Sequence, residues 1–471
     1  MTDRTAPRDA SVRRVIAASS VGTLFEWYDF YLYGSLAVFF GGLFFPQGNE
    51  RAALLASLAT FGAGFGVRPL GALVFGRVGD LVGRKVAFLV TIMTMGLSTA
   101  LIGFLPTYEQ VGIFAPIALV VLRLVQGLAL GGEYGGAATY VAEHVPDDRR
   151  GYYTSFIQTT ATLGFFVSLA VIAACRVGFG AEDFAAYGWR VPFLASFVLL
   201  GVSVYLRVRM QESPLFTRLK AAGHVSKNPL RESFGNRTNL RYVLIALFGA
   251  TAGQGVVWYT GQFYALTFLQ TTLKLSWQLA YTVVAIALAV GTPLFIVFGR
   301  LSDRIGRKRL ILGGCLLAAL TYVPIFVAMK AVGNPDGAAA VTSLPPGRAA
   351  TLVALLGLQM VYVAMVYGPI AAFLVELFPT SIRYTSMSLP YHLGNGWFGG
   401  FLPLIATSVT TSAWASDVFG DAAIYTGLIY PIAVCLLTAA VGGRFIRETK
   451  GHQIDTPTWR APEHLVSGGD S

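Results

Sequence analysis

The chain has 471 residues, of which 55% are hydrophobic and 13% charged, and it carries a formal net charge of +11. Its mean hydropathy is +0.61. A water-soluble globular protein of this composition would need a largely apolar surface, so that class is excluded and a bilayer protein is indicated. The positive charge does not indicate a nucleic-acid partner, because the basic residues form short clusters between apolar runs.

Twelve apolar runs reach the length of about 20 residues that a helix needs to cross the hydrocarbon core. In chain order they are 15–46, 52–76, 86–105, 110–142, 152–175, 188–206, 242–270, 278–298, 310–330, 350–378, 384–411 and 422–446. The sequence therefore predicts an all-α membrane protein with twelve transmembrane helices. The longest polar stretch divides six runs from six, which predicts a tail at 1–14, a bundle at 15–209, a loop at 210–241, a second bundle at 242–447 and a tail at 448–471.

The loops predict the orientation of the chain. Of the 35 Lys and Arg residues, 27 lie on the side that holds both tails, and five lie in the opposite loops. Because cytoplasmic loops carry the excess of Lys and Arg, both termini are predicted to be cytoplasmic. The first run is too long for a signal peptide and lacks a small-residue cleavage site, so it is expected to remain as the first transmembrane helix.

The two halves share two loop motifs. G-R-x2-D-x2-G-R-K occurs at 76–85 and again at 299–308, each time after the second run of a half. E-x2-P-x3-R occurs at 143–150 and again at 376–383, each time after the fourth run. The motifs recur at offsets of 223 and 233 residues, which indicates a duplicated plan with a small insertion.

This doubled motif within two six-helix halves resembles the major facilitator superfamily over essentially the whole chain. Longer stretches resemble the bacterial metabolite:proton symporter family, which includes carriers of α-ketoglutarate, citrate, shikimate and proline or betaine. These stretches are "FEWYDFYLYG", "GFGVRPLGALVFGRVGDLVGRK", "RLVQGLALGGEYGGAATYVAEHVPDDRRGYYTSF" and "ELFPTSIRYTSMSLPYHLGN". The resemblance implies two pseudo-twofold bundles that rock around a central cavity, in a monomeric protein of the bacterial inner membrane.

The resemblance also implies a role for the repeated loop motifs. Their charged residues are expected to form cytoplasmic networks that hold the outward-open state and break when the carrier turns inward. The expected gate residues are Asp80, Arg84, Glu143, Arg150, Asp303, Arg307, Glu376 and Arg383. The alternative is that basic residues in these loops only anchor the topology.

The first predicted helix carries two carboxylates, Glu26 and Asp29, three residues apart. An ionised side chain at the bilayer centre costs about 2.5 to 3.5 kcal/mol, so such groups face a wet cavity or a partner. With Gly22 and Tyr33 they form one stripe, which is expected to face the cavity. Two neighbouring carboxylates disfavour each other's ionisation, which suits one of them to carry a proton. The alternative is a static ion pair with an arginine of the second or fourth helix.

The fourth predicted helix places Arg123, Gln126 and Glu133 on one face. Arg123 and Glu133 lie about two to three turns apart, too far to pair directly. Arg123 in "RLVQG" resembles the arginine that many proton-coupled members of the superfamily carry in this helix, where it adjusts the protonation of a nearby carboxylate. Glu133 in "GGEYGG" is a candidate proton carrier or cavity ligand, with a structural hydrogen-bonding role as the alternative.

Arg68 precedes Pro69 in "GVRPLG", and its guanidinium could clamp a carboxylate bidentately. The alternative is an arginine that pairs with the first helix to hold the bundle together.

Hydroxyl, indole and amide groups are expected to complete the substrate site, although packing is the alternative for each aromatic ring. These candidate ligands are Tyr28, Tyr134, Trp258, Tyr259, Gln262, Tyr367 and Asn395. His392 lies inside an apolar span, where it can titrate, and is predicted to take part in proton coupling.

Aligning the two halves separates these charges from the scaffold. The first helix matches the seventh at an offset of 231 residues, and the aromatic frame is conserved while Glu26 and Asp29 fall on uncharged residues. The fourth helix matches the tenth at 233, and Arg123 and Glu133 fall on Leu and Val. We therefore expect that these unrepeated charges of the N-terminal half serve the function of the protein and not its scaffold.

These observations predict a proton-coupled symporter that imports a small organic acid by alternating access. Buried Arg68 and Arg123 favour an anion, whereas Glu26, Asp29 and Glu133 would suit the cationic end of a zwitterion such as proline or betaine, which is the alternative. The short C-terminal tail shows no heptads, unlike the coiled-coil tail of osmosensing proline and betaine carriers, and this favours organic acids.

A membrane-embedded enzyme or receptor is the more distant alternative. The sequence contains no zinc-type His/Glu cluster, no nucleophile elbow and no phosphate-binding loop, so no enzyme activity, metal or cofactor is predicted. Cys175, Cys315 and Cys435 lie far apart and are expected to be buried, inert thiols. The expected partners are a small-molecule substrate, a proton and the lipid bilayer, and not nucleic acid.

Overall fold

The computed structural model describes residues 9–46, 48–81, 84–132, 134–143, 145–208, 234–378 and 383–452. Over these ranges the protein is helical, and its β-structure consists of one isolated bridge between Leu275 and Val341. Seven continuous helical stretches of the described residues are long and apolar enough to cross a bilayer, and several of them join two or more helices. The helices group into twelve membrane-crossing segments, six in each half, so the predicted all-α membrane fold is confirmed.

Six segments form the N-terminal half, and several consist of two helices in succession. They are α1 (Asp9–Ser35) with α2 (Ala37–Phe44), α3 (Glu50–Gly66) with α4 (Arg68–Leu81), α5 (Arg84–Ile102), α7 (Phe114–Leu130) with α8 (Tyr134–Glu143), α9 (Arg150–Asp183), and α10 (Arg190–Leu194) with α11 (Ser196–Val208). The short helix α6 (Tyr108–Val111) precedes α7. α1 begins within the predicted 1–14 tail, because a membrane helix can continue beyond the hydrocarbon.

The C-terminal half repeats this plan. Its segments are α14 (Arg237–Ala246) with α15 (Ala252–Tyr259) and α16 (Ala265–Thr271), α17 (Trp277–Ile305), α18 (Arg307–Gly333), α19 (Pro346–Tyr367) with α20 (Ile370–Leu377), α21 (Arg383–Leu393) with α22 (Leu402–Thr410), and α24 (Ile429–Phe445). The short helix α23 (Ala413–Phe419) precedes the last segment. π-helical turns lie at η3 (Leu247–Thr251), η4 (Thr260–Tyr264) and η5 (Gly394–Gly400).

The interruptions within spans have local causes. α3 ends at Gly66 and α4 restarts at Arg68, because Pro69 has no amide hydrogen to donate and is tolerated only in the first turn of a helix. In the seventh and eleventh spans the interruptions are the π-helical turns, which occur frequently at functional sites. These irregular points lie beside the buried polar residues described below.

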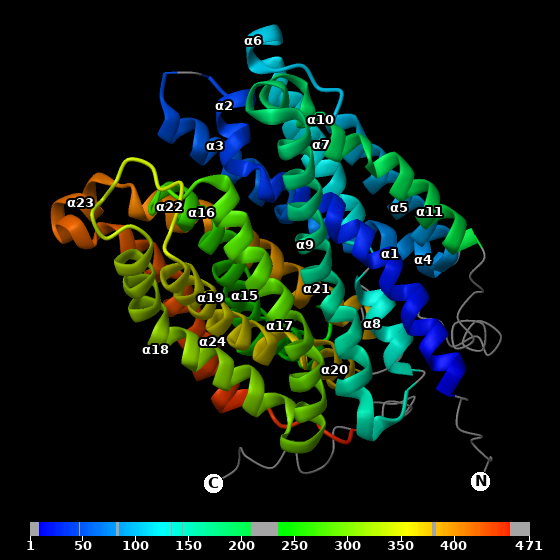
Figure 1. The fold of residues 1–471 in the computed structure, drawn as a ribbon. Coiled ribbons are helices and arrows are strands. Elements are labelled where there is room, and N and C mark those ends of the chain that lie inside the picture. Colours follow the sequence, from blue (N-terminus) through cyan, green and yellow to red (C-terminus); the bar gives the residue numbers. More distant parts are fainter. Residues whose placement is uncertain are drawn as a thin grey trace, which may run out of the picture.

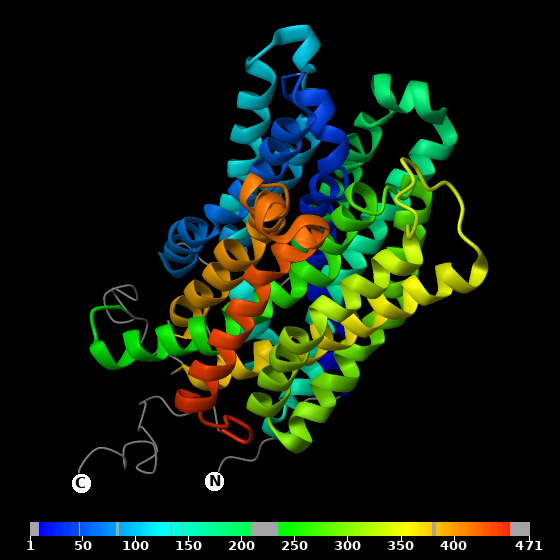
Figure 2. The same cartoon turned by 90° about the vertical axis from the view of Figure 1, so that its left-hand side faces the viewer.

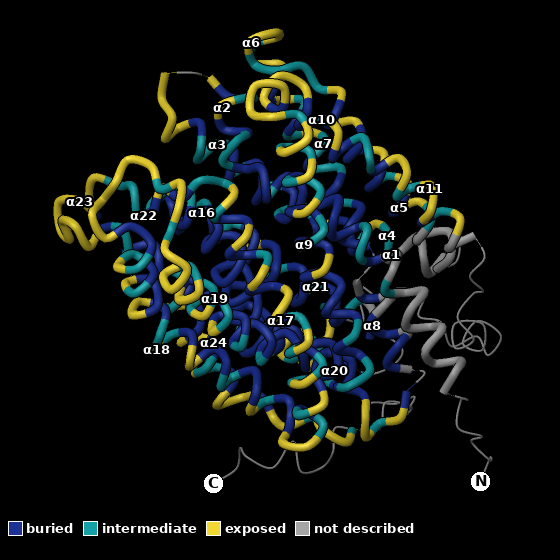
Figure 3. Tube along the Cα trace, in the orientation of Figure 1, coloured by how far each residue is buried: buried dark blue, intermediate teal, exposed yellow. Residues whose placement is uncertain are grey.

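Figure 1 shows the two halves side by side, with the start of α1 and the end of α24 at the same lower end of the molecule, and Figure 2 shows the arrangement after a quarter turn. We call this end the terminal face and the other end the opposite face. The halves meet where α9 packs on α17, and where α3 and α4 pack on η5 and α21. Buried residues concentrate in the interior in Figure 3, whereas large apolar side chains such as Leu320 point outward, as expected for contact with lipid.

Close backbone approach between α3 and α7 depends on Gly127. A Cβ atom at this position would lie 1.6 Å from the Gly64 carbonyl oxygen. Replacement by alanine would have to push the two helices apart, and overpacking of this kind costs about 1 to 3 kcal/mol or more. We expect Gly127→Ala to lower the unfolding temperature of the detergent-solubilised protein.

Gly357 of α19 provides the matched control for this prediction. A Cβ atom there would meet nothing within 4 Å, and alanine has the higher helix propensity. Gly357→Ala should therefore unfold at the wild-type temperature or above it. If Gly127→Ala unfolds at the same temperature as Gly357→Ala, the close approach of α3 and α7 at Gly127 does not require glycine.

Candidate functional site

Arg68 is the centre of the candidate site. It is fully buried at the start of α4, and its guanidinium carbon lies 4.3 Å from the ring centre of Phe65, 4.8 Å from that of Phe30 and 5.1 Å from that of Trp27. These rings hold the cation by cation–π attraction. Nε and Nη2 of Arg68 have no hydrogen-bond partner among the described residues. The guanidinium is therefore fixed in place with one edge unsatisfied.

Tyrosine hydroxyls surround this cation. Four tyrosines interact electrostatically with Arg68, namely Tyr259, Tyr31, Tyr391 and Tyr367, and so do Arg123 and His392. Three of the four tyrosines belong to the C-terminal half, and the hydroxyls of Tyr367 and Tyr391 lie 2.7 Å apart. Arg68 thus faces neutral hydrogen-bonding groups of the other half of the molecule.

Two predicted ligands of the substrate site pack as aromatic rings. Tyr259 crosses between the halves, where its ring lies 5.1 Å from that of Phe65 in an edge-on arrangement. Trp258 packs within the C-terminal half, at 4.6 Å from the Tyr367 ring. Tyr259 and Tyr367 therefore reach the Arg68 region, and the Trp258 side chain also contacts Tyr31 of the N-terminal half.

Polar side chains of the C-terminal half are also buried with unused hydrogen-bonding capacity. Neither amide atom of Gln262 makes a hydrogen bond to a described residue, and the His392 imidazole has only the Gly131 backbone as a hydrogen-bonding neighbour. Asn395 differs, because its amide exchanges hydrogen bonds of 2.9 and 3.0 Å with the amide of Gln254. A buried polar group without a partner costs about 1 to 3 kcal/mol, so such groups commonly mark a place for a ligand or water.

Arg123 of α7 is bound within its own half. Nη1 donates to Oε1 of Gln126 at 2.7 Å and to the Phe30 carbonyl at 3.3 Å, and Nη2 donates to the Phe61 carbonyl at 3.5 Å. Gln126 in turn donates to the Thr99 hydroxyl at 2.7 Å. The common helical face predicted for Arg123 and Gln126 is confirmed, and the pair links α7 to α1, α3 and α5.

Asp29 and Tyr28 of α1 point toward the sixth span. The Ser196 hydroxyl of α11 donates to Oδ1 of Asp29 at 2.5 Å, and the Tyr28 hydroxyl donates to the Pro192 carbonyl of α10 at 2.9 Å. Both contacts lie inside the N-terminal half, and Tyr28 lies away from the junction where a substrate ligand was expected. Glu26 is buried in the same helix.

The stripe of α1 that carries Asp29 was expected to face the cavity, and the structure differs. The Tyr33 hydroxyl of that stripe contacts Ser57 of α3 at 3.1 Å. The face toward the C-terminal half is instead the one with Tyr31 and Gly34, and the ring of Phe263 lies 4.9 Å from that of Tyr31. The physical reason is that the large aromatic rings fill the junction, whereas the hydrogen-bond donors for the carboxylate lie in the N-terminal half.

Other predicted residues lie outside the described part of the chain. Glu133 itself is not described, and the described positions do not include the side chains of Tyr134, Asp80, Arg84 and Glu143.

Four of the predicted gate residues meet at the terminal face. Arg150 of α9 donates to Glu376 of α20 at 2.9 Å, and Arg307 of α18 donates to the same carboxylate at 3.0 and 3.3 Å. Asp303 accepts from Arg307 at 2.7 Å and from two backbone amides at the start of α9 at 2.8 Å. Arg383 instead forms hydrogen bonds within its own half, where its guanidinium donates to the backbone carbonyls of residues 375 and 378. The network joins the two halves.

The segment after α24 covers this network. Glu448 accepts from two backbone amides at the start of α18 at 2.8 and 3.2 Å, and the Thr449 hydroxyl donates to Glu376 at 2.7 Å. Arg150 donates to the His452 carbonyl at 3.2 Å. Burial lowers the pKa of the His452 imidazole, but the contact with Arg150 uses the backbone and does not depend on the charge of the ring.

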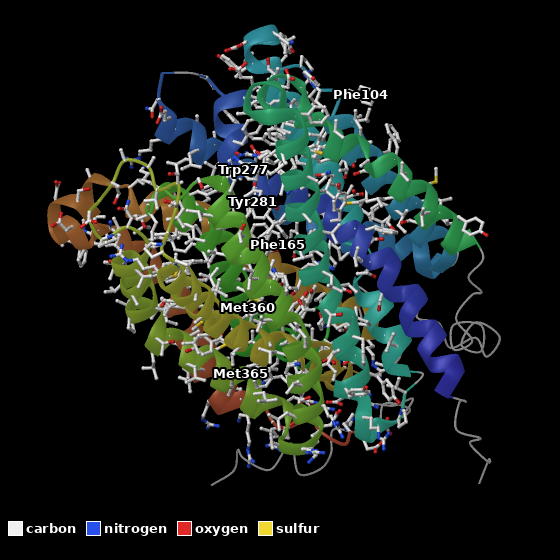
Figure 4. All side chains as sticks on the ribbon, in the orientation of Figure 1. Phe104, Phe165, Trp277, Tyr281, Met360 and Met365 are labelled. Carbon is white, nitrogen blue, oxygen red and sulfur yellow. The ribbon has the colours of Figure 1, made fainter. Side chains whose placement is uncertain are left out.

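The halves also touch at the opposite face. The Tyr281 hydroxyl of α17 donates to the backbone carbonyl of residue 35 at 2.6 Å, and the rings of Phe165 and Phe263 stack at 4.4 Å. The Arg176 guanidinium of α9 lies 4.9 Å from the Trp277 ring. Figure 4 shows Phe165, Trp277 and Tyr281 along the line where α9 meets α17. Contacts between the two halves are thus present at both faces.

A family model described as Major Facilitator Superfamily matches residues 20–403. The chain belongs to this superfamily. The facilitator is 35% identical to the inner membrane metabolite transport protein YhjE of Escherichia coli, over 88% of this chain and 90% of that protein. It is 31% identical to the shikimate transporter of Escherichia coli, over 91% and 93% of the two chains. It is 30% identical to the glycine betaine/proline/ectoine/pipecolic acid transporter OusA of Dickeya dadantii, over 95% and 86%.

The resemblance to the metabolite:proton symporter family is therefore confirmed, and the facilitator is a multi-pass membrane protein. A solved structure of the proton:xylose symporter XylE, bound to 6-bromo-6-deoxy-D-glucose, superposes with a TM-score of 0.71, covering 95% of this chain and 98% of that one. The sequence identity is 19%, so this likeness shows the fold alone.

Sequence reasoning missed several residues of the facilitator's site. Tyr31 lies four residues after Trp27 on the inner face of α1, and this spacing was available as a signal. Tyr391 directly precedes His392, but its contact with Tyr367 joins two helices that are remote in the sequence. Ser196 carries no recognisable signal, since one serine in an apolar span is not distinctive.

Proposed function

We propose that the facilitator is a proton-coupled symporter that imports a small organic acid across a bacterial inner membrane by alternating access. We further propose that it works as a monomer within the bilayer, with both termini in the cytoplasm, as the distribution of basic loops favours. The observation that carries the proposal is Arg68. Its unsatisfied nitrogens, Nε and Nη2, lie on one edge of the guanidinium, and their spacing matches the two oxygens of a carboxylate.

A zwitterionic osmolyte is the alternative substrate. The names of the relatives include both classes, shikimate and alpha-ketoglutarate on one side and glycine betaine and proline on the other. A quaternary ammonium would need open aromatic faces. The faces of Trp27, Phe30 and Phe65 are already occupied by the Arg68 guanidinium, which favours the acid.

Asp29 is the proposed proton carrier, with Glu26 as its neighbour in α1. The Asp29 carboxyl is buried and receives its hydrogen bond from a neutral hydroxyl, that of Ser196. A group held in this way can take up and release a proton without breaking an ion pair. Arg123 is the proposed fixed cation of the same half, because its hydrogen bonds hold it to backbone carbonyls and Gln126.

Transport would require the two faces to open in turn. The contacts at the terminal face and at the opposite face are both present, which supports the view that the structure represents an occluded arrangement. In the proposed cycle, substrate and proton enter after the opposite face opens, and both leave after the network of Arg150, Asp303, Arg307 and Glu376 separates.

The test of the proposed function is uptake by proteoliposomes that contain the purified protein. A panel of radiolabelled mono-, di- and tricarboxylates, proline and betaine should be offered with and without an inward proton gradient. At least one carboxylate should accumulate only with the gradient and should show counterflow. Accumulation of proline or betaine alone would support the alternative, and absence of counterflow for every compound would reject transport.

Glu376→Gln should loosen the terminal face. The amide cannot form the ion pair with Arg150 that joins the two halves, although Arg150 and Arg307 each keep an acidic neighbour within their own half. A cysteine placed at Ser155, which is buried where α9 meets α17, should then react with a thiol reagent at least about tenfold faster. The control is Arg149→Gln, since the Arg149–Asp148 pair is exposed and worth about 0 to 1 kcal/mol. Equal labelling in both variants would remove Glu376 from the gate.

A further inference from the structure

His392 and Arg68 belong to different halves and lie in helices that pack together. α21 packs on α4, and one turn further on the Trp397 indole donates to the Gly66 carbonyl at 3.0 Å. Arg68 is among the charged groups that act electrostatically on His392. The imidazole is buried and stands edge-on to the Tyr391 ring at 5.4 Å. The junction therefore brings a cation from one half beside an imidazole from the other.

Both groups have unused hydrogen-bonding capacity. Over the part of the chain that the structure describes, Nε and Nη2 of Arg68 lack partners, and the His392 imidazole has the Gly131 backbone as its one hydrogen-bonding neighbour, which leaves a ring nitrogen unused. A neutral imidazole donates from one nitrogen and accepts at the other, whereas an imidazolium beside Arg68 would place two positive charges in one buried site. Arg68 and His392 come from the two halves and interact electrostatically, so a ligand that binds both would bridge the halves.

We propose that His392 binds the substrate opposite Arg68 as a neutral hydrogen-bonding ligand, and that the substrate is a monocarboxylate that carries hydroxyl or keto oxygens. The inference rests on the proposed function, and it replaces the proton-coupling role predicted for His392. The carboxylate occupies the free edge of Arg68, and His392 binds an oxygen on the same molecule. Binding then draws α21 toward α4 and favours the occluded arrangement.

The restriction to one carboxylate follows from the number of available cations. Nη1 and Nη2 of Arg123 donate to Gln126 and to two backbone carbonyls of its own half, which leaves only its Nε without a partner, so among the described residues of this region Arg68 alone offers two free donors on one guanidinium edge. Apart from Arg123, the ionisable groups that interact with Arg68 are the tyrosine hydroxyls and the imidazole, which are neutral hydrogen-bonding groups. Such groups match hydroxyl or keto oxygens, whereas a second carboxylate would remain without a cation.

The test compares His392→Gln and His392→Ala in proteoliposomes loaded with wild-type amounts of folded protein. The probe is the carboxylate that the wild-type protein takes up best in the panel. Alanine should raise KM about tenfold or more, because the hydrogen bond to the substrate oxygen is lost, and glutamine should restore most of the affinity, since its amide also donates and accepts. Both variants should still accumulate substrate in response to the proton gradient.

Thr438→Val is the matched control, because the Thr438 hydroxyl is also buried without a described partner but lies in α24, outside the junction. It should leave KM unchanged. Loss of gradient-driven accumulation in His392→Gln with exchange preserved would make His392 a proton carrier and overturn the proposal. An unchanged KM in His392→Ala would overturn it as well. If the alanine variant does not fold, the glutamine variant decides between the two roles.

Competition with unlabelled acids tests the substrate class in the wild-type protein. Lactate, gluconate and shikimate should compete better than succinate or citrate, which carry additional carboxylates. Stronger competition by the di- or tricarboxylates would overturn the inference while leaving the proposed symport of an acid intact. Failure of every carboxylate to compete, with uptake of proline or betaine, would instead reject the proposed function itself.

Discussion

Arg68→Met is expected to abolish saturable uptake of the acid substrate. Methionine retains the volume of the side chain among Phe65, Phe30 and Trp27 but removes the charge and both free donors of the guanidinium edge. A bidentate contact to a buried carboxylate is worth about 2 to 5 kcal/mol when one partner is truncated, which corresponds to a loss of affinity of at least about thirtyfold. The measurement is substrate binding to purified protein, together with uptake by proteoliposomes.

Arg68→Lys distinguishes charge from geometry in this prediction. Lysine keeps the positive charge but offers a point charge in place of a planar fork, so binding should survive with a KM raised by about tenfold. Both variants need wild-type elution in gel filtration and a comparable unfolding temperature. Full uptake by Arg68→Met would show that Arg68 only supports the bundle, which is the structural role considered for it at the outset.

Asp29→Asn should abolish accumulation against a concentration gradient while leaving exchange of substrate measurable. Asparagine has the shape of the acid and can still accept the hydrogen bond from Ser196, but it cannot release a proton. Net uptake should therefore lose its response to an imposed proton gradient, with a decrease of at least about tenfold in the accumulation ratio. Counterflow measured without a gradient should continue, because it needs no net movement of protons.

Ser196→Ala is the matched control for Asp29→Asn. It removes the hydrogen bond to the carboxyl but leaves the acid in place, so accumulation should persist with a changed dependence on pH. Accumulation by Asp29→Asn at the wild-type level would exclude Asp29 from the proton path and direct attention to Glu26 in the same helix. Loss of exchange as well as accumulation would indicate a structural role for the carboxyl.

Much of the architecture could be predicted because a bilayer imposes simple rules. Runs of apolar residues predict the twelve spans, and the repeated loop motifs predict the division into two halves. The interruptions were harder to predict. The π-helical turns at 247–251, 260–264 and 394–400 preserve the apolar pattern, so neither hydropathy nor length reveals them. Only the restart at Arg68 had a local signal, in the proline that follows it.

The candidate site was predictable in its members but not in its contacts. Charged and polar residues in apolar spans stand out, which is why Arg68, Arg123 and Asp29 were singled out from the sequence. Helical periodicity then defines faces of α1 without telling which face meets the other half. The face with Asp29 was chosen for its charge, yet the structure turns it toward Ser196 and places Tyr31 at the junction. Roles in proton coupling and substrate binding stay predictions.

The gate residues show the same limit. The motifs identified Arg150, Asp303, Arg307 and Glu376 as members of a network, and the structure brings these four together. Their pairing could not be derived from the sequence, because Glu376 is bound by arginines that lie 226 and 69 residues away along the chain. The contribution of the segment after α24 was also not foreseen, since a short polar tail carries no distinctive pattern.

The way in which Glu376 is shared affects how easily the terminal face can separate. Arg307 and Asp303 belong to the same half as Glu376, whereas Arg150 also contacts Asp147 within its own half. When the halves part, each arginine keeps an acidic neighbour and no ion is stranded in a dry environment. Separation therefore breaks the ion pair between Arg150 and Glu376 but leaves neither arginine without an acidic partner, which lowers its energetic cost.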